Sequence, residues 1–328
     1  MDTYEDNVDL MVREVGPREG FQIEPRLVPA EEKVRLISAL AECHLPEIQV
    51  TSFVSPKWVP QMADAERVVE LLAPVEGVRY VATALNRKGV ERAAATGKVA
   101  IDAIVSCSAS ESFSLRNVNR TTAQVLSGLP ERIELYKTLG LRDSVLSVNA
   151  AFGCNWSGQV ELGRVLSLIT QLWEVATACG LGVKEISLAD TMGWADPAKV
   201  REMVAAVQRE WAGIAIGLHL HDTRGMGLAN AYAAIEGGVH RLDAAVGGLG
   251  GCPFAGRPGA SGNIATEDLV HMCDRLGVRT GVDCDGLVEV GRLAEEIVGH
   301  TLPGKVMRGG LLSHLLGDAE GQREAMGA

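Results

Sequence analysis

Short β-rich runs alternate with longer helical patterns eight times along the chain, and this rhythm limits the fold more than any other feature. The predicted strands cover residues 9–15, 47–53, 79–85, 101–107, 145–152, 184–190, 215–221 and 241–247. Between them, apolar residues recur every three or four positions, as in residues 29–43 and 163–180, which is typical of helices that bury one face. Repeated strand–helix units imply parallel strands joined by crossovers. Eight such units in about 250 residues predict an α/β fold, the (β/α)8 TIM barrel.

The same rhythm predicts the domain organisation. After the eighth unit, residues 286–300 form one more helical pattern, and a Gly-rich tail follows. An open α/β sheet is the alternative, but such sheets usually carry a G-x-G-x-x-G nucleotide loop, which GLGGCP at 248–253 matches poorly. Because no linker divides the chain, we predict a barrel domain over residues 1–282. A C-terminal helical extension with a flexible tail is predicted over 283–328.

Charge and hydropathy argue against several classes of protein. The formal net charge of −11 disfavours nucleic acids and anionic membranes as partners. No apolar stretch approaches the roughly 18 to 20 residues that span a bilayer, and the acidic start lacks the features of a signal peptide. The seven cysteines form no C-x-x-C pair and are odd in number, as expected of reduced thiols. We therefore predict a cytoplasmic protein without nucleic-acid or membrane partners.

Polar side chains gather after the predicted strands. In a TIM barrel the active site lies at the C-terminal face, where the strand ends and the loops that follow them meet. This chain places reactive groups at most of these ends, namely Arg18, Glu19, Gln49, Asn149, Asp190, His219, His221, Cys252 and Asn263. The distribution predicts an active site at the mouth of the barrel.

Two histidines stand one residue apart in the segment GLHLHDTRGMGLAN, residues 217–230. Residues two apart on a strand share a face, so His219 and His221 are predicted to project together into the barrel mouth as metal ligands. Hydrogen-bonded core histidines are the alternative. The remaining ligands would be the Glu19 carboxylate and the Asn263 amide oxygen. Mixed nitrogen and oxygen donors favour Mg²⁺ or Mn²⁺, with Zn²⁺ or Co²⁺ as alternatives.

Five motifs together resemble the 3-hydroxy-3-methylglutaryl-CoA lyase family, which belongs to the metal-dependent TIM-barrel lyases and synthases. They are VGPREGFQ (15–22), TSFVSPKWVPQMAD (51–64), SLADTMGW (187–194), HLHDTRGMGLAN (219–230) and GLGGCPFAGRPGASGNIATEDLV (248–270). The H-x-H-D-T motif indicates only the superfamily. The cysteine-bearing segment is more specific to the lyases.

The resemblance implies a retro-Claisen cleavage of an acyl-CoA substrate. A 3-hydroxy-3-methylglutaryl thioester breaks between C2 and C3 into acetyl-CoA and acetoacetate, a reaction of leucine degradation. A divalent ion that holds the hydroxyl and a carboxylate of the substrate lowers the hydroxyl pKa. The ligands implied here are Glu19, His219, His221 and Asn263. Enzymes of this type are commonly homodimers, so a homodimer is expected.

The resemblance also implies roles for three further residues. Arg18 would donate hydrogen bonds to the thioester oxygen as negative charge develops there, and its alternative role is an ion pair with Glu19. Cys252, in a Gly-rich loop, would transfer a proton; the alternative is a packing residue. Asp190 would act as an acid–base or orienting carboxylate, or else cap the following turn.

Three departures from the family pattern bear on the substrate. Glu19 stands where the family usually has aspartate, so the metal or the carboxylate shifts by roughly an ångström. Gln49 occupies the position of a catalytic glutamate, and an amide carries neither charge nor a transferable proton. The loop after Cys252 is longer than expected and contains Arg257, which could meet an additional acidic group of a substrate or remain solvated.

Four functions therefore stay open. The first is a lyase acting on 3-hydroxy-3-methylglutaryl-CoA. The second is a lyase of the same mechanism acting on a different 3-hydroxy-3-substituted acyl-CoA. The third is a Claisen-type synthase that joins acetyl-CoA to a 2-oxo acid, and the fourth is a non-catalytic binding protein.

Overall fold

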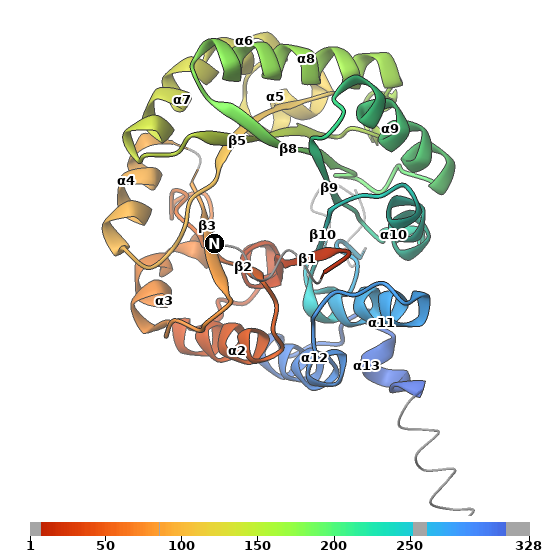
Figure 1. The fold of residues 1–328 in the computed structure, drawn as a ribbon. Coiled ribbons are helices and arrows are strands. Elements are labelled where there is room, and N and C mark those ends of the chain that lie inside the picture. Colours follow the sequence, from red (N-terminus) through yellow and green to blue (C-terminus); the bar gives the residue numbers. More distant parts are fainter. Residues whose placement is uncertain (1–7, 85, 252–260, 313–328) are drawn as a thin grey trace, which may run out of the picture.

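Eight parallel strands form the centre of the computed structural model, which describes residues 8–84, 86–251 and 261–312. They run in the order β3-β2-β1-β10-β9-β8-β5-β4, and Figure 1 shows them curling into a ring inside the helices. Their bounds are β1 Met11–Glu14, β2 Glu47–Ser52, β3 Arg79–Thr83, β4 Ala103–Ser108, β5 Asp143–Asn149, β8 Gly182–Ala189, β9 Ala215–His219 and β10 Arg241–Ala244. A short antiparallel pair, β6 Gly153–Cys154 and β7 Gly158–Gln159, lies outside this sheet. The predicted (β/α)8 barrel is confirmed.

All eight predicted strand ends differ from the observed ones by one to three residues. The seventh strand, β9, ends at His219 rather than at His221, and the eighth, β10, ends at Ala244 because the 3-10 helix η4 (Val246–Gly248) follows. His221 instead forms an isolated antiparallel bridge with Asn263. Gly247 in η4 has a φ of 66°, a left-handed conformation that suits glycine and that an extended strand does not adopt.

The wall of the barrel is weakest between β3 and β4, the two ends of the strand order. They are joined by one isolated parallel bridge between Val81 and Ala100, just before β4 begins. There the amide of Ala82 donates to the carbonyl of Ala100 at 2.9 Å, and the amide of Ala100 donates to Tyr80 at 2.8 Å. Above this bridge the two strands share no ladder within the described residues. We call this opening the seam.

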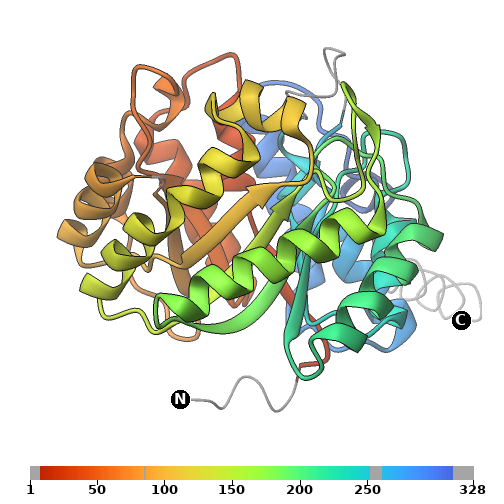
Figure 2. The ribbon, with the colours of Figure 1, turned by 90° about the horizontal axis from the view of Figure 1, so that it is seen from above.

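Helices surround the strands, as Figure 1 and the side view in Figure 2 show. The main ring consists of α2 Ala30–Glu42, α3 Ala65–Leu71, α4 Arg87–Thr96, α7 Leu129–Thr138, α8 Leu162–Ala178, α9 Pro197–Glu210, α10 Gly227–Glu236 and α11 Thr266–Leu276. Shorter elements are η2 Gly16–Gly20, α1 Phe21–Ile23, η3 Pro60–Met62, α5 Glu111–Val118, α6 Thr122–Ser127 and α13 Val306–Gly309. Among the described helices, none combines the length and the apolar character needed to cross a membrane.

Helix α12 (Cys284–Val298) follows the eighth strand–helix unit, as the sequence predicts. It packs between α2 and α11, so it fills a gap in the ring of helices (Figure 1). Its buried face includes Leu287, Ala294 and Ile297. The division of the chain at residue 282 stays a prediction, because this helix shares its packing with the barrel.

The lower interior of the barrel is ionic. TIM barrels usually fill this space with layers of branched apolar side chains. Here the Arg13 guanidinium donates to both oxygens of Asp243, at 2.9 and 2.7 Å. Arg241 pairs with Glu185 and with Asp243. These buried charges are paired on several sides, which is the condition under which charges are tolerated away from water.

Glu267, in the first turn of α11, predicts a pH dependence of stability. One of its buried carboxylate oxygens accepts from the Gly247 amide at 2.9 Å, and the other has no hydrogen-bond partner among the described residues. Burial raises the pKa of this carboxyl to about 8, from an ordinary value of 4.5. Between these two values the folded protein keeps a proton that the unfolded chain has lost, so stability falls as the pH rises.

Replacement Glu267→Gln removes this proton equilibrium. We expect the wild-type free energy of unfolding to contain a component that falls by up to about 1.4 kcal/mol per pH unit between roughly pH 5 and 8. The variant should lack that component. Urea denaturation at pH 5, 6.5, 8 and 9 measures both slopes. Identical slopes for the two proteins would contradict the assignment.

Candidate active site and metal-binding triad

The turn after β1 positions the first two site residues. The buried Glu14 carboxylate accepts from the Gly16 amide at 2.7 Å and from the Thr266 hydroxyl at 2.6 Å, so the turn is tied to the start of α11. The π-helix η2, which follows β1, carries Arg18 and Glu19. A π-helix is a rare conformation that is found frequently at functional sites.

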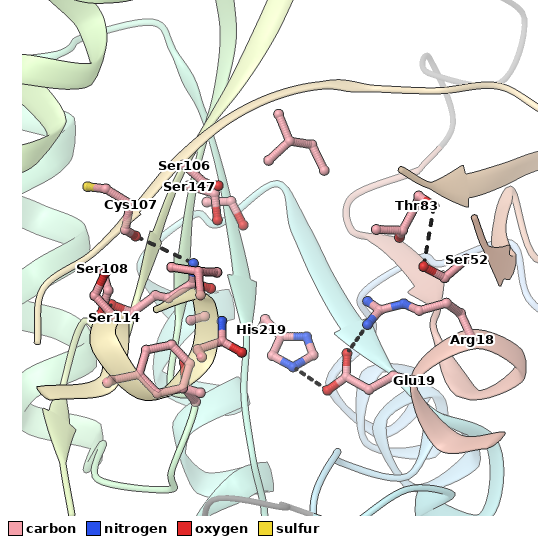
Figure 3. Close-up of a pocket in the computed structure, with 18 of the residues that line it drawn as sticks. Arg18, Glu19, Ser52, Thr83, Ser106, Cys107, Ser108, Ser114, Ser147 and His219 are labelled. Carbon is pink, nitrogen blue, oxygen red and sulfur yellow. Dashed lines mark hydrogen bonds and ion pairs between the residues drawn. The ribbon is translucent and has the colours of Figure 1, made fainter. Parts of the chain in front are cut away.

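Glu19 meets both histidines at the mouth of the barrel. Its Oε1 atom lies 3.2 Å from His219 Nε2 and 3.6 Å from His221 Nε2. The two Nε2 atoms are themselves 3.2 Å apart. Figure 3 shows His219 and Glu19 facing one another, with Arg18 beyond Glu19. The three ligand atoms all lie within 4.8 Å of one another, so the predicted approach of these residues is confirmed although His221 lies beyond the strand.

The other ring nitrogens hold the imidazoles in place. His219 Nδ1 lies 3.2 Å from Asp243 Oδ2, and His221 Nδ1 lies 2.9 Å from the Thr191 carbonyl oxygen. A carbonyl oxygen can only accept, so His221 Nδ1 is protonated and its Nε2 can offer a lone pair when the ring is neutral. Such partners of the second nitrogen are typical of histidines that bind metal ions. Asp243 is a candidate site residue that the sequence analysis did not identify, although the alternation of β10 could have indicated it.

Glu19, His219 and His221, which we call the triad, have electrostatics that favour a positive charge between them. Burial opposes ionisation of Glu19, but the His219 and Arg18 charges hold the pKa of its carboxyl well below the usual range. Burial lowers the pKa of His219, yet Glu19 and Asp243 overcome this effect and raise it to about 9. A divalent cation supplies such a positive charge, and the nitrogen and oxygen donor set fits Mg²⁺, Mn²⁺ or Zn²⁺.

Arg18 is held by two neighbours. Its Nε and Nη2 atoms donate to Gln49 Oε1 at 2.9 and 2.6 Å, and its Nη1 atom lies 3.0 Å from Glu19 Oε2. The expected alternative, an ion pair with Glu19, is therefore present in the structure. Gln49 acts as an acceptor that orients the guanidinium.

Asn263 and Asp190 each keep one buried oxygen without a partner among the described residues, Oδ1 in Asn263 and Oδ2 in Asp190. The other Asp190 oxygen accepts from the Trp194 amide at 2.7 Å, so Asp190 does cap the turn after β8. Burial raises its pKa. Neither residue is among those that line the main cavity, and their roles as ligand and acid–base group stay predictions.

The predicted proton donor and the loop cation lie outside the described residues. Cys252 and Arg257 both fall in the segment 252–260. The role of Cys252 in proton transfer and the role of Arg257 in substrate binding therefore stay predictions.

A large cavity opens beside the triad. Its volume is about 610 Å³, within the range of roughly 300–1,000 Å³ that is usual for ligand pockets. Arg18, Glu19, Gln49 and both triad histidines line one side of it. The opposite side is formed by β4, β5 and α5, and Figure 3 shows Ser106, Ser108, Ser114 and Ser147 there.

A (β/α)8 barrel with this triad at the mouth of a ligand-sized cavity defines a TIM-barrel enzyme that is suited to a metal ion. Comparison with known proteins then gives the family: the chain belongs to the HMGL-like family, which matches residues 9–294. It is 40% identical over 279 residues to the mitochondrial hydroxymethylglutaryl-CoA lyase of Bos taurus, covering 85% of this chain and 82% of that one. It is 37% identical over 294 residues to the hydroxymethylglutaryl-CoA lyase YngG of Bacillus subtilis, covering 90% and 95%.

Solved structures give the same relationship. An HMG-CoA lyase from Acinetobacter baumannii, in complex with coenzyme A and 3-methylmalate, superposes with a TM-score of 0.82 at 38% identity, covering 95% of this chain and 98% of that one. The HMG-CoA lyase of Bacillus subtilis has a TM-score of 0.82 at 36% identity, covering 90% and 96%. The predicted relationship and the predicted enzyme class, a carbon–carbon lyase, are confirmed.

Asp243→Asn tests whether the carboxylate behind His219 supports the metal site. An amide can turn its NH2 group toward Nδ1 and so favour the wrong tautomer of the ring. We expect Mn²⁺ to bind about 10 to 100 times more weakly. Asp102→Asn is the matched control, because Asp102 belongs to the same ionic interior but pairs with Arg79 and Lys184. Calorimetric titration of both variants measures the difference. Equal affinity in Asp243→Asn and the wild type would refute the role.

Proposed function

We propose that this protein is a metal-dependent lyase that cleaves 3-hydroxy-3-methylglutaryl-CoA to acetyl-CoA and acetoacetate. The observation that carries the proposal is the approach of Glu19, His219 and His221 at the mouth of the cavity, with Arg18 beside them. Its similarity to the Acinetobacter baumannii lyase bound to coenzyme A supports an acyl-CoA substrate.

A divalent cation held by Glu19, His219, His221 and Asn263 would lower the pKa of the C3 hydroxyl and orient the bond between C2 and C3. The Oδ1 atom of Asn263, which has no hydrogen-bond partner among the described residues, supports its inclusion. Mg²⁺ or Mn²⁺ suits this donor set best, and Zn²⁺ or Co²⁺ is the alternative.

Arg18 would stabilise the negative charge that develops on the thioester oxygen when C2 leaves C3. Gln49 fixes the plane of the guanidinium by accepting two of its hydrogen bonds. Such preorganised donors are effective because they need not reorient during the reaction. As an amide, Gln49 supplies no proton, so the enolate carbon must be protonated by another group, for which we propose Cys252. Asp190 would serve as a further orienting or acid–base carboxylate.

The proposal extends to the cellular location and the oligomeric state of the protein. We propose a homodimer in the cytoplasm that takes part in leucine degradation and has no nucleic-acid partner. The net charge of −11 supports the absence of a nucleic-acid partner. Both cytoplasmic and mitochondrial enzymes occur among its relatives, so fractionation of the native cells is the direct test of location.

The deciding experiment is a turnover assay with the metal-free protein. Addition of Mg²⁺ or Mn²⁺ should start the release of acetyl-CoA and acetoacetate from 3-hydroxy-3-methylglutaryl-CoA, and a chelator should stop it. Two results would refute the proposal. Thiol release from acetyl-CoA and a 2-oxo acid would identify a Claisen synthase, and the absence of both metal binding and turnover would identify a binding protein.

A further inference from the structure

We propose that the preferred substrate carries, in place of the C3 methyl group, a longer polar substituent that ends in a carboxylate. The substituent runs along a row of serines inside the barrel toward Arg132 and Arg120. This inference rests on the proposed lyase function and names the class of acyl group that the substrate carries.

The first step is the row of small residues. Strand register places Ser106 of β4 opposite Ser147 of β5, Ser147 opposite Ser187 of β8, and Ser187 opposite Gly217 of β9. Four neighbouring strands thus align three serines and a glycine in one row across the sheet. Large branched side chains usually fill the interior of such a barrel. Beside the three serines their absence leaves room for a ligand beneath the triad, whereas Arg241 and Glu185 fill the space next to Gly217.

The second step is the chemistry of that row. Ser106, Ser147 and Ser187 all line the cavity, and Figure 3 shows Ser106 and Ser147 side by side in its wall. Within the described part of the chain, their three hydroxyl groups make no hydrogen bond to another residue. Polar groups inside a protein are normally satisfied, so a ligand that offers polar atoms matches this wall better than an alkyl chain does.

The third step is the direction in which the cavity extends. β4 is the edge strand beside the seam, and its inward-facing Ile104 lines the cavity together with Val125 and Gly128 from the helical side. Arg132 of α7 lies one helical turn before Tyr136, whose hydroxyl donates to the Ile104 carbonyl at 3.5 Å. Residues four apart share a helix face, so Arg132 faces the same part of β4.

The fourth step is charge. Arg120 and Arg132 both line this part of the cavity, and a Cβ atom at Gly128 would lie 3.4 Å from Arg120 Nη1. Across the described ranges neither guanidinium pairs with a carboxylate, whereas Arg13 and Arg241 inside the barrel are paired. Arg132 is half-buried and Arg120 is exposed, so Arg132 in particular favours an anionic ligand at this end of the cavity. Guanidinium groups bind carboxylates with two parallel hydrogen bonds.

Cleavage of such a substrate balances in the same way as the parent reaction. The C3 hydroxyl loses its proton and becomes the carbonyl of a 3-oxo acid, the bond between C2 and C3 breaks, and C2 gains a proton to give acetyl-CoA. The substituent stays on the 3-oxo acid. Every substrate therefore yields acetyl-CoA, and its release is a common readout.

The test compares three thioesters that differ only at C3, bearing a methyl, a propyl or a 2-carboxyethyl group. We expect the metal-loaded enzyme to show kcat/KM at least 10-fold higher for the carboxyethyl substrate than for the other two. If the methyl substrate is cleaved and the carboxyethyl substrate gives no such advantage, this inference fails while the proposed function stands. If no thioester is cleaved, the proposed function fails.

Two sets of variants test separately the charge of Arg132 and the room that the serines leave for the substituent. Arg132→Gln should reduce the carboxyethyl-to-propyl ratio of kcat/KM by at least 10-fold, and Arg132→Lys should restore part of it. Ser147→Leu, or Ser106→Leu if the first variant does not fold, should reduce the carboxyethyl-to-methyl ratio. Arg142→Gln, which alters an exposed arginine before β5, is the control and should leave both ratios unchanged.

A phosphate group of coenzyme A is the other anion that these arginines could bind. Inhibition by free coenzyme A shows whether Arg132 binds the carboxylate of the substituent or a phosphate group of coenzyme A. Under the proposal, Arg132→Gln leaves the inhibition constant of coenzyme A unchanged and alters only the discrimination among acyl groups. A weaker inhibition constant, accompanied by an equal loss for all three thioesters, would overturn the proposal.

Discussion

His219→Ala and His221→Ala should each reduce metal-dependent thioester cleavage by about 1,000-fold or more. Each variant removes one of the two imidazoles whose Nε2 atoms lie 3.2 Å apart. A cation at this point contributes several kcal/mol of charge stabilisation, and about 1.4 kcal/mol corresponds to a factor of ten in rate. Steady-state assays with added Mn²⁺, together with metal analysis of the purified proteins, measure both effects.

His240→Ala is the matched control for this prediction. His240 is exposed just before β10 and lies away from the triad, so its replacement should change neither the metal content nor the rate. If either triad variant kept its metal and more than a tenth of the wild-type rate, the assignment of Glu19, His219 and His221 as ligands would have to be abandoned.

Arg18→Met should lower kcat by about 100- to 1,000-fold, the cost usually seen when one preorganised donor to a developing oxyanion is removed. Binding of the cation should survive, because Glu19 still meets both histidines. Arg18→Lys should recover little of the loss, since an ammonium group cannot reproduce the planar contacts that Arg18 makes with Gln49 and Glu19. Single-turnover kinetics with bound metal separate the chemical step from substrate binding.

Arg35→Met provides the comparison for Arg18. Arg35 is a surface arginine of α2 that pairs with Glu296, and its loss should leave kcat unchanged. A rate for Arg18→Met that stayed within threefold of the wild type would exclude Arg18 as the group that stabilises the enolate.

Local periodicity was sufficient to predict the barrel. The eight apolar runs and the helices between them appear in the predicted order, since burial of one strand or helix face depends mainly on nearby residues. The ends of the elements were less predictable. β10 stops at Ala244, and the left-handed Gly247 directs the chain into η4. Conformations of this kind are set by packing against the rest of the loop.

The approach of Glu19, His219 and His221 was predicted for a reason that proved only partly correct. His219 and His221 were assigned to one strand, yet only His219 belongs to β9. They still face each other because the Thr191 carbonyl and the Asp243 carboxylate hold their Nδ1 atoms. Glu19 reaches them from a π-helix, a conformation that the residues around Glu19 do not predict.

The sequence by itself determined the order of strands and helices, the polar ends of the strands and the side chains proposed as metal ligands, because these depend on residue type and short-range spacing. Tertiary structure decided how the strands align. That alignment brings Ser106, Ser147 and Ser187 into one row, leaves the seam between β3 and β4 and sets Asp243 behind His219. These features arise from contacts between residues far apart in the chain. They can be identified only when the strand register and the closure of the barrel are known.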